Sequence, residues 1–66
     1  MQNKIKIERA IKDLTQEDLA QLVGVSRQTI NSIEKNRYVP STVLALKIAK
    51  VFAKTVNDIF ELEEGD

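Results

Sequence analysis

The sequence predicts an all-α fold built from five short helices, and two observations carry that prediction. Hydroxyl residues that suit helix N-caps recur along the chain, and apolar residues follow at helical spacing. Gly24 and Pro40 fall at points where a helix would have to end. The chain has 66 residues, of which 42% are hydrophobic, so we expect residues 1–66 to form one compact domain.

Caps and breakers place each helix in turn. Thr15 and Asp18 resemble a capping box, Gly24 ends the helix that follows, and Ser26 opens the next one. That helix must end before Pro40, because the residue before a proline avoids the helical region. Ser41 and Thr55 cap the last two helices. The expected helices span about residues 4–12, 16–23, 27–35, 42–53 and 56–60.

Apolar spacing indicates which faces turn inward. The first helix carries its aliphatic residues at helical intervals (Ile5, Ile7, Ala10, Ile11 and Leu14). The helix of residues 42–53 is apolar on most sides, with Lys47, Lys50 and Lys54 as its one wet stripe, so we expect it at the centre of the core. At both ends of the chain, apolar residues alternate with charged ones, which also fits short strands.

Composition excludes several classes of function. The chain has no Cys and no His, so we expect no disulfide, no zinc or other metal site, no cofactor and no histidine-based catalysis. The carboxylates are scattered rather than converging, which argues against an enzyme. No run approaches the ~18 apolar residues of a membrane span, and the start is polar, so we expect a cytoplasmic protein with no membrane partner. We expect no second domain and therefore no site for a small-molecule ligand.

The formal net charge of zero hides an uneven distribution. All ten basic residues lie between Lys4 and Lys54, together with five acidic ones, whereas the segment from Thr55 onward holds the other five acidic residues and no basic one. The two parts therefore carry net charges of +5 and −5. This pattern suits a basic body that meets a polyanion while an acidic end turns away, and it also fits a solvated surface with a charged tail.

The two helices around Gly24 carry the most informative pattern. Ile30 and Ile33 form the inner face of the second of them, which leaves a polar outer face without a carboxylate: Arg27, Gln28, Asn31, Ser32 and Lys35. Arg can bond guanine, Gln and Asn can bond adenine, Ser can bond either, and Lys can meet a phosphate. Two helices with a tight turn also occur in bundles that touch no DNA, and a polar face can simply be solvated.

The segment TQEDLAQLVGVSRQTINSIE (residues 15–34) resembles the helix-turn-helix of the Cro/cI repressor family, also called the XRE family. The continuations KNRYVPS (35–41), LALKIAKVF (44–52) and DIF (58–60) are similar to small stand-alone members, so the resemblance covers about residues 3–62. It implies a five-helix, phage-repressor-like domain. It also implies sequence-specific binding of double-stranded DNA in the major groove by a transcriptional regulator, which we expect to be a repressor.

The resemblance assigns roles to single residues. Base contacts are expected from Arg27, Gln28, Asn31 and Ser32, and backbone contacts from Gln16, Ser26, Thr29, Lys35, Asn36, Arg37 and Tyr38. Tyr38 could instead pack against the helix of residues 42–53. Arg9 and Glu34 match a salt bridge between the first and third helices, and Ala20 matches the small residue where the second and third helices cross. The chain departs from the common family pattern at Glu8, Asp13 and Ala53, where many members have Leu, Gly and Gly.

One recognition helix covers few base pairs, so we expect a symmetric homodimer on a palindromic operator with half-sites roughly 34 Å apart. The resemblance implies a dimer interface near the C-terminus, at Val39, Ile59, Phe60 and Leu62, although Phe60 could be an ordinary core residue. The alternative function is an antitoxin-like protein-interaction module with secondary DNA binding. A large exposed apolar patch would favour that alternative, and the sequence shows no surplus apolar stripe beyond the core and the Phe60–Leu62 end.

Overall fold

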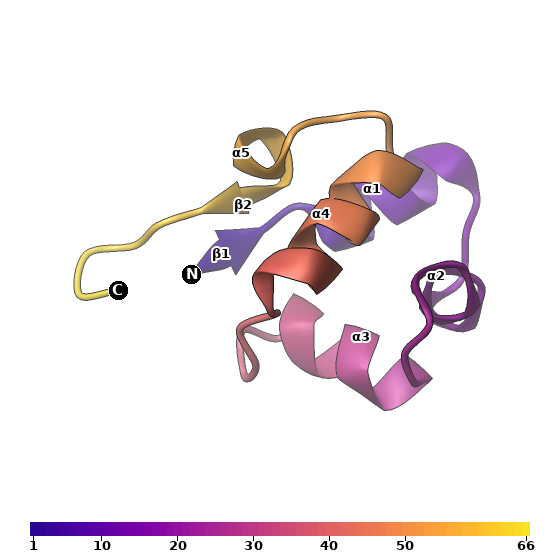
Figure 1. Cartoon of the computed structure of the whole chain (residues 1–66), viewed down its shortest axis with the longest axis horizontal. Helices are drawn as coiled ribbons and strands as arrows, with labels where there is room; N and C mark the ends of the chain where they lie inside the picture. The colour runs from indigo at the N-terminus through magenta and orange to yellow at the C-terminus, as the bar shows by residue number, and fades with distance from the viewer.

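The computed structural model describes residues 1–66 and contains five helices and one pair of short strands (Figure 1). The all-α prediction, with short strands at the two ends, is confirmed, and each helix agrees with its predicted bounds to within two residues. The N-terminal strand precedes the segment where Ile5 and Ile7 alternate with lysines, and that segment is helical. No helix in the chain combines the length and the apolar character that crossing a membrane requires. In chain order the elements are β1 (Gln2–Asn3), α1 (Ile5–Lys12), α2 (Gln16–Val23), α3 (Arg27–Glu34), α4 (Thr42–Val51), α5 (Val56–Ile59) and β2 (Phe60–Glu61).

Hydroxyl caps open four of the helices, as the sequence predicts. Thr15 Oγ1 accepts a hydrogen bond from the Asp18 amide at 3.0 Å, and the Thr15 amide donates back to Asp18 Oδ2 at 3.0 Å. Thr55 and Asp58 form the same reciprocal pair at α5, and Ser26 and Ser41 cap α3 and α4. The backbone hydrogen bonds to each carboxylate hold the pKa of Asp18 and Asp58 below the ordinary aspartate value.

A residue in the left-handed conformation follows each of the first four helices, α1 to α4. Gly24 has φ 77° after α2, where the sequence places a glycine. Asp13, Asn36 and Ala53 adopt the same conformation without being glycine, with φ of 56°, 59° and 54°. A Cβ makes this conformation costly, and least so for Asn and Asp, so Ala53 is the most strained of the three.

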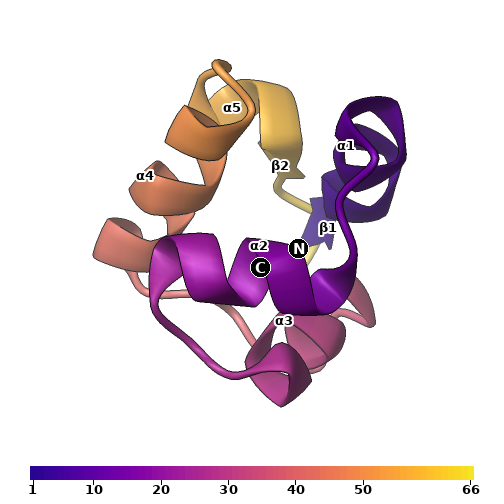
Figure 2. The same ribbon diagram turned by 90° about the vertical axis from the view of Figure 1, so that its right-hand side faces the viewer.

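The core consists of 13 buried hydrophobic residues, and α4 supplies four of them (Leu44, Ala45, Ile48 and Ala49). Figure 2 shows α2 in front of the molecule, between α1 and α4, with α3 below it. α2 packs against both α3 and α4, and Ala20 is fully buried on its inner side. The absence of a larger side chain there lets the helices approach closely.

The burial expected for the apolar residues of α1 and α4 is wrong for some of them. Ile7, Ile11, Val43 and Leu46 are more than half exposed. On α1 the buried positions are Ile5 and Glu8, and the Glu8 carboxylate accepts a bond from Lys54 Nζ at 2.6 Å. Pairing with a cation makes burial of this carboxylate possible. The buried side of α1 therefore includes Glu8, and Ile7 and Ile11 lie on its exposed side. The expectation of no surplus apolar stripe is therefore also wrong.

β1 and β2 join the two ends of the chain in an antiparallel pair, with Gln2 opposite Glu61 and Asn3 opposite Phe60. The Asn3 side chain donates to the Ile33 carbonyl at 2.8 Å, which links this pair to the end of α3. The prediction that Ile59 and Phe60 lie at the dimer interface is wrong, because these residues are only 1% and 7% exposed and belong to the core.

Candidate nucleic-acid interface

The outer face of α3 presents its polar side chains as the sequence predicts. Arg27 and Gln28 are exposed in the first turn, and Asn31 and Ser32 are half-buried one turn later. Ser26 Oγ accepts from the Thr29 amide at 3.2 Å and lies 3.0 Å from the Thr29 hydroxyl, so these two side chains fix the start of the helix. The side chains that can read bases therefore stand on a rigid first turn.

The loop after α3 continues this surface. Lys35, Asn36, Arg37 and Tyr38 are all exposed. A shallow hollow is lined by Gln28, Thr29, Ser32, Arg37 and Tyr38. Tyr38 is about half exposed and also lines a second hollow toward α4. It therefore lies between the two places that the sequence allows, the DNA-facing surface and the side of α4.

Gln16 opens α2 beside α3 and is held by three neighbours. Its Nε2 donates to Asn31 Oδ1 at 3.2 Å and to Glu34 Oε1 at 3.3 Å, while its Oε1 accepts from Arg27 Nη1 at 3.5 Å. Both amide hydrogens are thus in use within the protein. The Asp18 amide donates to Thr15 Oγ1, whereas the amides of Gln16 and Glu17 have no helical acceptor and remain available to an anion.

An ion pair fixes α3 against α1. Arg9 donates to both carboxylate oxygens of Glu34, from Nε at 2.7 Å and from Nη2 at 3.0 Å, and its Nη1 donates to the Leu14 carbonyl at 2.9 Å. The side chains of Arg9 and Glu34 are 14% and 7% exposed. Hydrogen bonds to Glu34 raise the pKa of Arg9, so the guanidinium stays charged at neutral pH. The only acid of α3 is thereby neutralised.

Sequence reasoning missed the bonds that connect these residues. Gln16, Asn31 and Glu34 each have a predicted role, yet nothing in their spacing shows that one side chain joins all three. The link from Asn3 to the Ile33 carbonyl and to Asn36 Oδ1 at 3.3 Å was also missed, because it spans some thirty residues of sequence. Such contacts depend on how helices cross, which periodicity does not encode.

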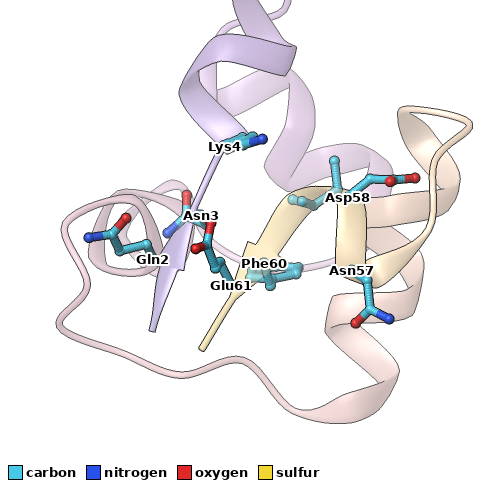
Figure 3. A pocket seen from close by; sticks show the side chains of 8 residues that line it. Gln2, Asn3, Lys4, Asn57, Asp58, Phe60 and Glu61 are labelled. Carbon is cyan, nitrogen blue, oxygen red and sulfur yellow. The ribbon is translucent and has the colours of Figure 1, made fainter. Parts of the chain in front are cut away.

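A separate small hollow lies over the strand pair (Figure 3). Its volume is about 60 Å³, and polar side chains such as Gln2, Asn57 and Glu61 stand around its mouth. A space of this size holds a few water molecules. None of the residues predicted to contact DNA lines it.

Comparison with known proteins extends over almost the whole chain. A family model described as helix-turn-helix matches residues 5–59. An uncharacterised HTH-type transcriptional regulator of Methanocaldococcus jannaschii is 56% identical over 66 residues, covering 100% of both chains. The HTH-type transcriptional regulator YgzD of Bacillus subtilis is 53% identical over 64 residues, covering 97% of each.

Solved structures share the fold. The restriction-modification controller protein C.AhdI of Aeromonas hydrophila superposes with a TM-score of 0.79 at 30% identity, covering 86% of each chain. The clp gene regulator ClgR of Corynebacterium glutamicum gives a TM-score of 0.76 at 26% identity over 82% of this chain. The chain spans 57% of the ClgR chain. The likeness is thus one of sequence and of helix arrangement together.

Proposed function

The chain belongs to the Cro/cI-type helix-turn-helix family of DNA-binding transcriptional regulators, and we propose that it is a homodimeric repressor that reads a palindromic operator with α3. The observation that carries this proposal is the outer face of α3. It has exposed bonding groups, a capped first turn and no free carboxylate. Occupying an operator in this way blocks access of polymerase to the same DNA.

Arg27, Gln28 and Ser32 are the residues that we assign to base edges. Arg27 and Gln28 are long, exposed side chains at the start of α3, the part of a recognition helix that enters the major groove. Asn31 also orients Gln16, because its Oδ1 accepts a hydrogen bond from Gln16 Nε2. An amide oxygen has a second lone pair and the Nδ2 is a donor, so we assign Asn31 to base edges as well.

The residues around this face position the DNA backbone. Lys35 and Arg37 supply the cations, and the first amides of α2 at Gln16 supply a helix N-terminus for a phosphate. The remaining polar groups of the surface complete the backbone contacts: Ser26, Thr29, Asn36 and Tyr38.

Selection of bound sequences from random DNA, followed by affinity measurements on variants, tests the readout. Gln28→Ala should cost about 1–3 kcal/mol on the selected site and relax preference at one position. Lys35→Ala should weaken binding to all sequences about equally. It should also reduce the slope of log affinity against log salt concentration by about one, the share of a single phosphate contact. Lys6→Ala, at an exposed lysine of α1, is the matched control. A uniform loss for Gln28→Ala together with a base-specific loss for Lys35→Ala would reverse the assignment.

The dimer contact is proposed at Val39 and Leu62. These side chains are 66% and 78% exposed, whereas Ile59 and Phe60 are buried. The loop after α3 and the segment after β2 lie at the same end of the molecule (Figure 1). A two-fold contact there would place two α3 helices side by side on one face of the DNA.

Sedimentation at micromolar concentration tests this contact. The wild type should have about twice the monomer mass, because burying two exposed aliphatic residues per copy favours association. Leu62→Glu should shift the protein toward monomer and weaken operator binding, while Leu46→Glu, a matched change at an exposed leucine of α4, should leave the mass unchanged. A wild type that stays monomeric both free and on DNA refutes the dimer.

A further inference from the structure

A groove runs along the outer side of α4. Three hollows follow one another there, and neighbouring hollows share residues: Lys50 joins the first two, and Gly24 and Lys47 join the second to the third. Aliphatic side chains stand along this path although they are in contact with solvent. Leu22, Val43 and Leu46 are 62%, 62% and 57% exposed. Water-exposed aliphatic groups gathered in a concave surface mark an interaction site.

Lysines line the groove without any acidic residue among the lining side chains. Lys47, Lys50 and Lys54 lie at helical intervals on α4 and just beyond it, and all three are exposed. Lys54 is paired with Glu8, whereas Lys47 and Lys50 have no ion-pair partner. The groove therefore combines an apolar floor with two uncompensated positive charges.

The groove lies on a different side of the molecule from the reading face. Figure 2 shows α4 and α5 on one side of α2 and α1 on the other, with α3 below. The groove touches the turn between α2 and α3 at Gly24, and none of its lining side chains is assigned to base edges. At the end nearest α3 it shares Thr29 and Tyr38 with the residues assigned to the DNA backbone, whereas the other two hollows contain no residue assigned to DNA. Something bound in it would therefore sit beside the DNA rather than replace it.

We propose that this groove binds a partner protein through an amphipathic helix in which carboxylates flank aliphatic residues. The aliphatic floor matches the apolar stripe of such a helix, and Lys47 and Lys50 match its acidic edges. The ten residues of α4 extend about 15 Å, which suits a contact of roughly three helical turns. DNA would leave Leu22 and Leu46 uncovered. The acidic end of a second copy offers Leu62 as its one exposed aliphatic residue, which is too little to fill the groove.

A designed peptide of about 14 residues tests the groove, with leucines at i, i+3, i+4 and i+7 and glutamates at the other positions. Its binding should saturate, and the NMR shifts it causes should cluster at Leu22, Leu46 and Lys50. The double change Lys47→Glu with Lys50→Glu should weaken binding by about tenfold or more, and a peptide carrying Lys in place of Glu should restore it. Lys6→Glu, beside exposed Ile7 of α1, is the matched control and should change little.

Three results overturn the proposal. The first is a set of peptide shifts that lie outside the groove, or an equal loss for Lys6→Glu. The second is a loss of operator affinity and salt dependence in the Lys47→Glu, Lys50→Glu protein, which would assign the lysines to phosphates. The third is dissociation of the dimer by Leu46→Glu, which would make the occupant a second copy. All substituted side chains are exposed, so thermal melting should show that each variant folds.

Discussion

Removal of Arg9 is expected to destabilise the protein far more than removal of an exposed lysine. In Arg9→Ala the Glu34 carboxylate, 7% exposed, keeps only the bond from Gln16, and the Leu14 carbonyl loses the guanidinium as its donor. Breaking a buried pair from one side costs about 3–5 kcal/mol, because the remaining charge is left without compensation. Both side chains here are largely buried, so we expect a loss of about 3 kcal/mol.

That loss is large for a chain of 66 residues, whose whole free energy of unfolding is roughly 3–10 kcal/mol. A change of 3 kcal/mol corresponds to a fall in Tm of roughly 12–24 °C for a domain of this size. Urea denaturation and thermal melting measure both quantities. Lys6→Ala, also on α1 but exposed and unpaired, should change the free energy of unfolding by less than about 0.5 kcal/mol.

A double variant separates the ion pair from mere packing. Arg9→Met combined with Glu34→Leu removes both charges, so it should recover most of the stability lost in Arg9→Ala. Its operator binding should recover less, because Gln16 then lacks its Glu34 acceptor. The reasoning is wrong if Arg9→Ala behaves like Lys6→Ala, or if the double variant is less stable than Arg9→Ala.

Two further predictions concern the helix ends. Ala53→Gly should raise the free energy of unfolding by about 0.5–1 kcal/mol, because φ is 54° at this position. Ala10→Gly, at an exposed position inside α1, should lower it by about 1 kcal/mol. Equal effects of the two changes would contradict the strain argument. The lowered pKa values of Asp18 and Asp58 mean that their caps stabilise the fold above the ordinary carboxyl pKa near 4 and are lost as pH falls through the lowered values. The stability gap between the wild type and Asp18→Asn with Asp58→Asn should therefore be constant from about pH 5 to 8 and close in acid, as pH-dependent melting would show.

Local chemistry made the helix starts predictable. A hydroxyl followed three residues later by an acid, as at Thr15 and Asp18, acts within one turn, so it can be read from the chain alone. The end of α4 was less clear, because Ala53 carries the left-handed conformation that the sequence usually marks with glycine. The family resemblance located the reading helix for the same reason, since its motif is nearly contiguous in sequence.

Long-range contacts set the limits of that prediction. Burial of Glu8 depends on Lys54, and burial of Phe60 depends on a strand formed by Asn3, both far away in sequence. A helix that is apolar on most sides does not reveal which side turns inward, which is why the exposure of Val43 and Leu46 was missed. Ile59 and Phe60, which were expected at a dimer contact, belong to the core for the same reason.

The short helix α2 connects the two surfaces. Its first residue, Gln16, lies among the side chains of α3, and Leu22, near its end, forms part of the α4 groove. The helix is fixed at its start by the Thr15 box and along its length by buried Leu19 and Ala20, so neither surface can move it easily. A partner in the groove therefore has no path for altering base readout through α2. It would act by adding contacts beside the DNA, which raises occupancy of the operator without changing the preferred sequence.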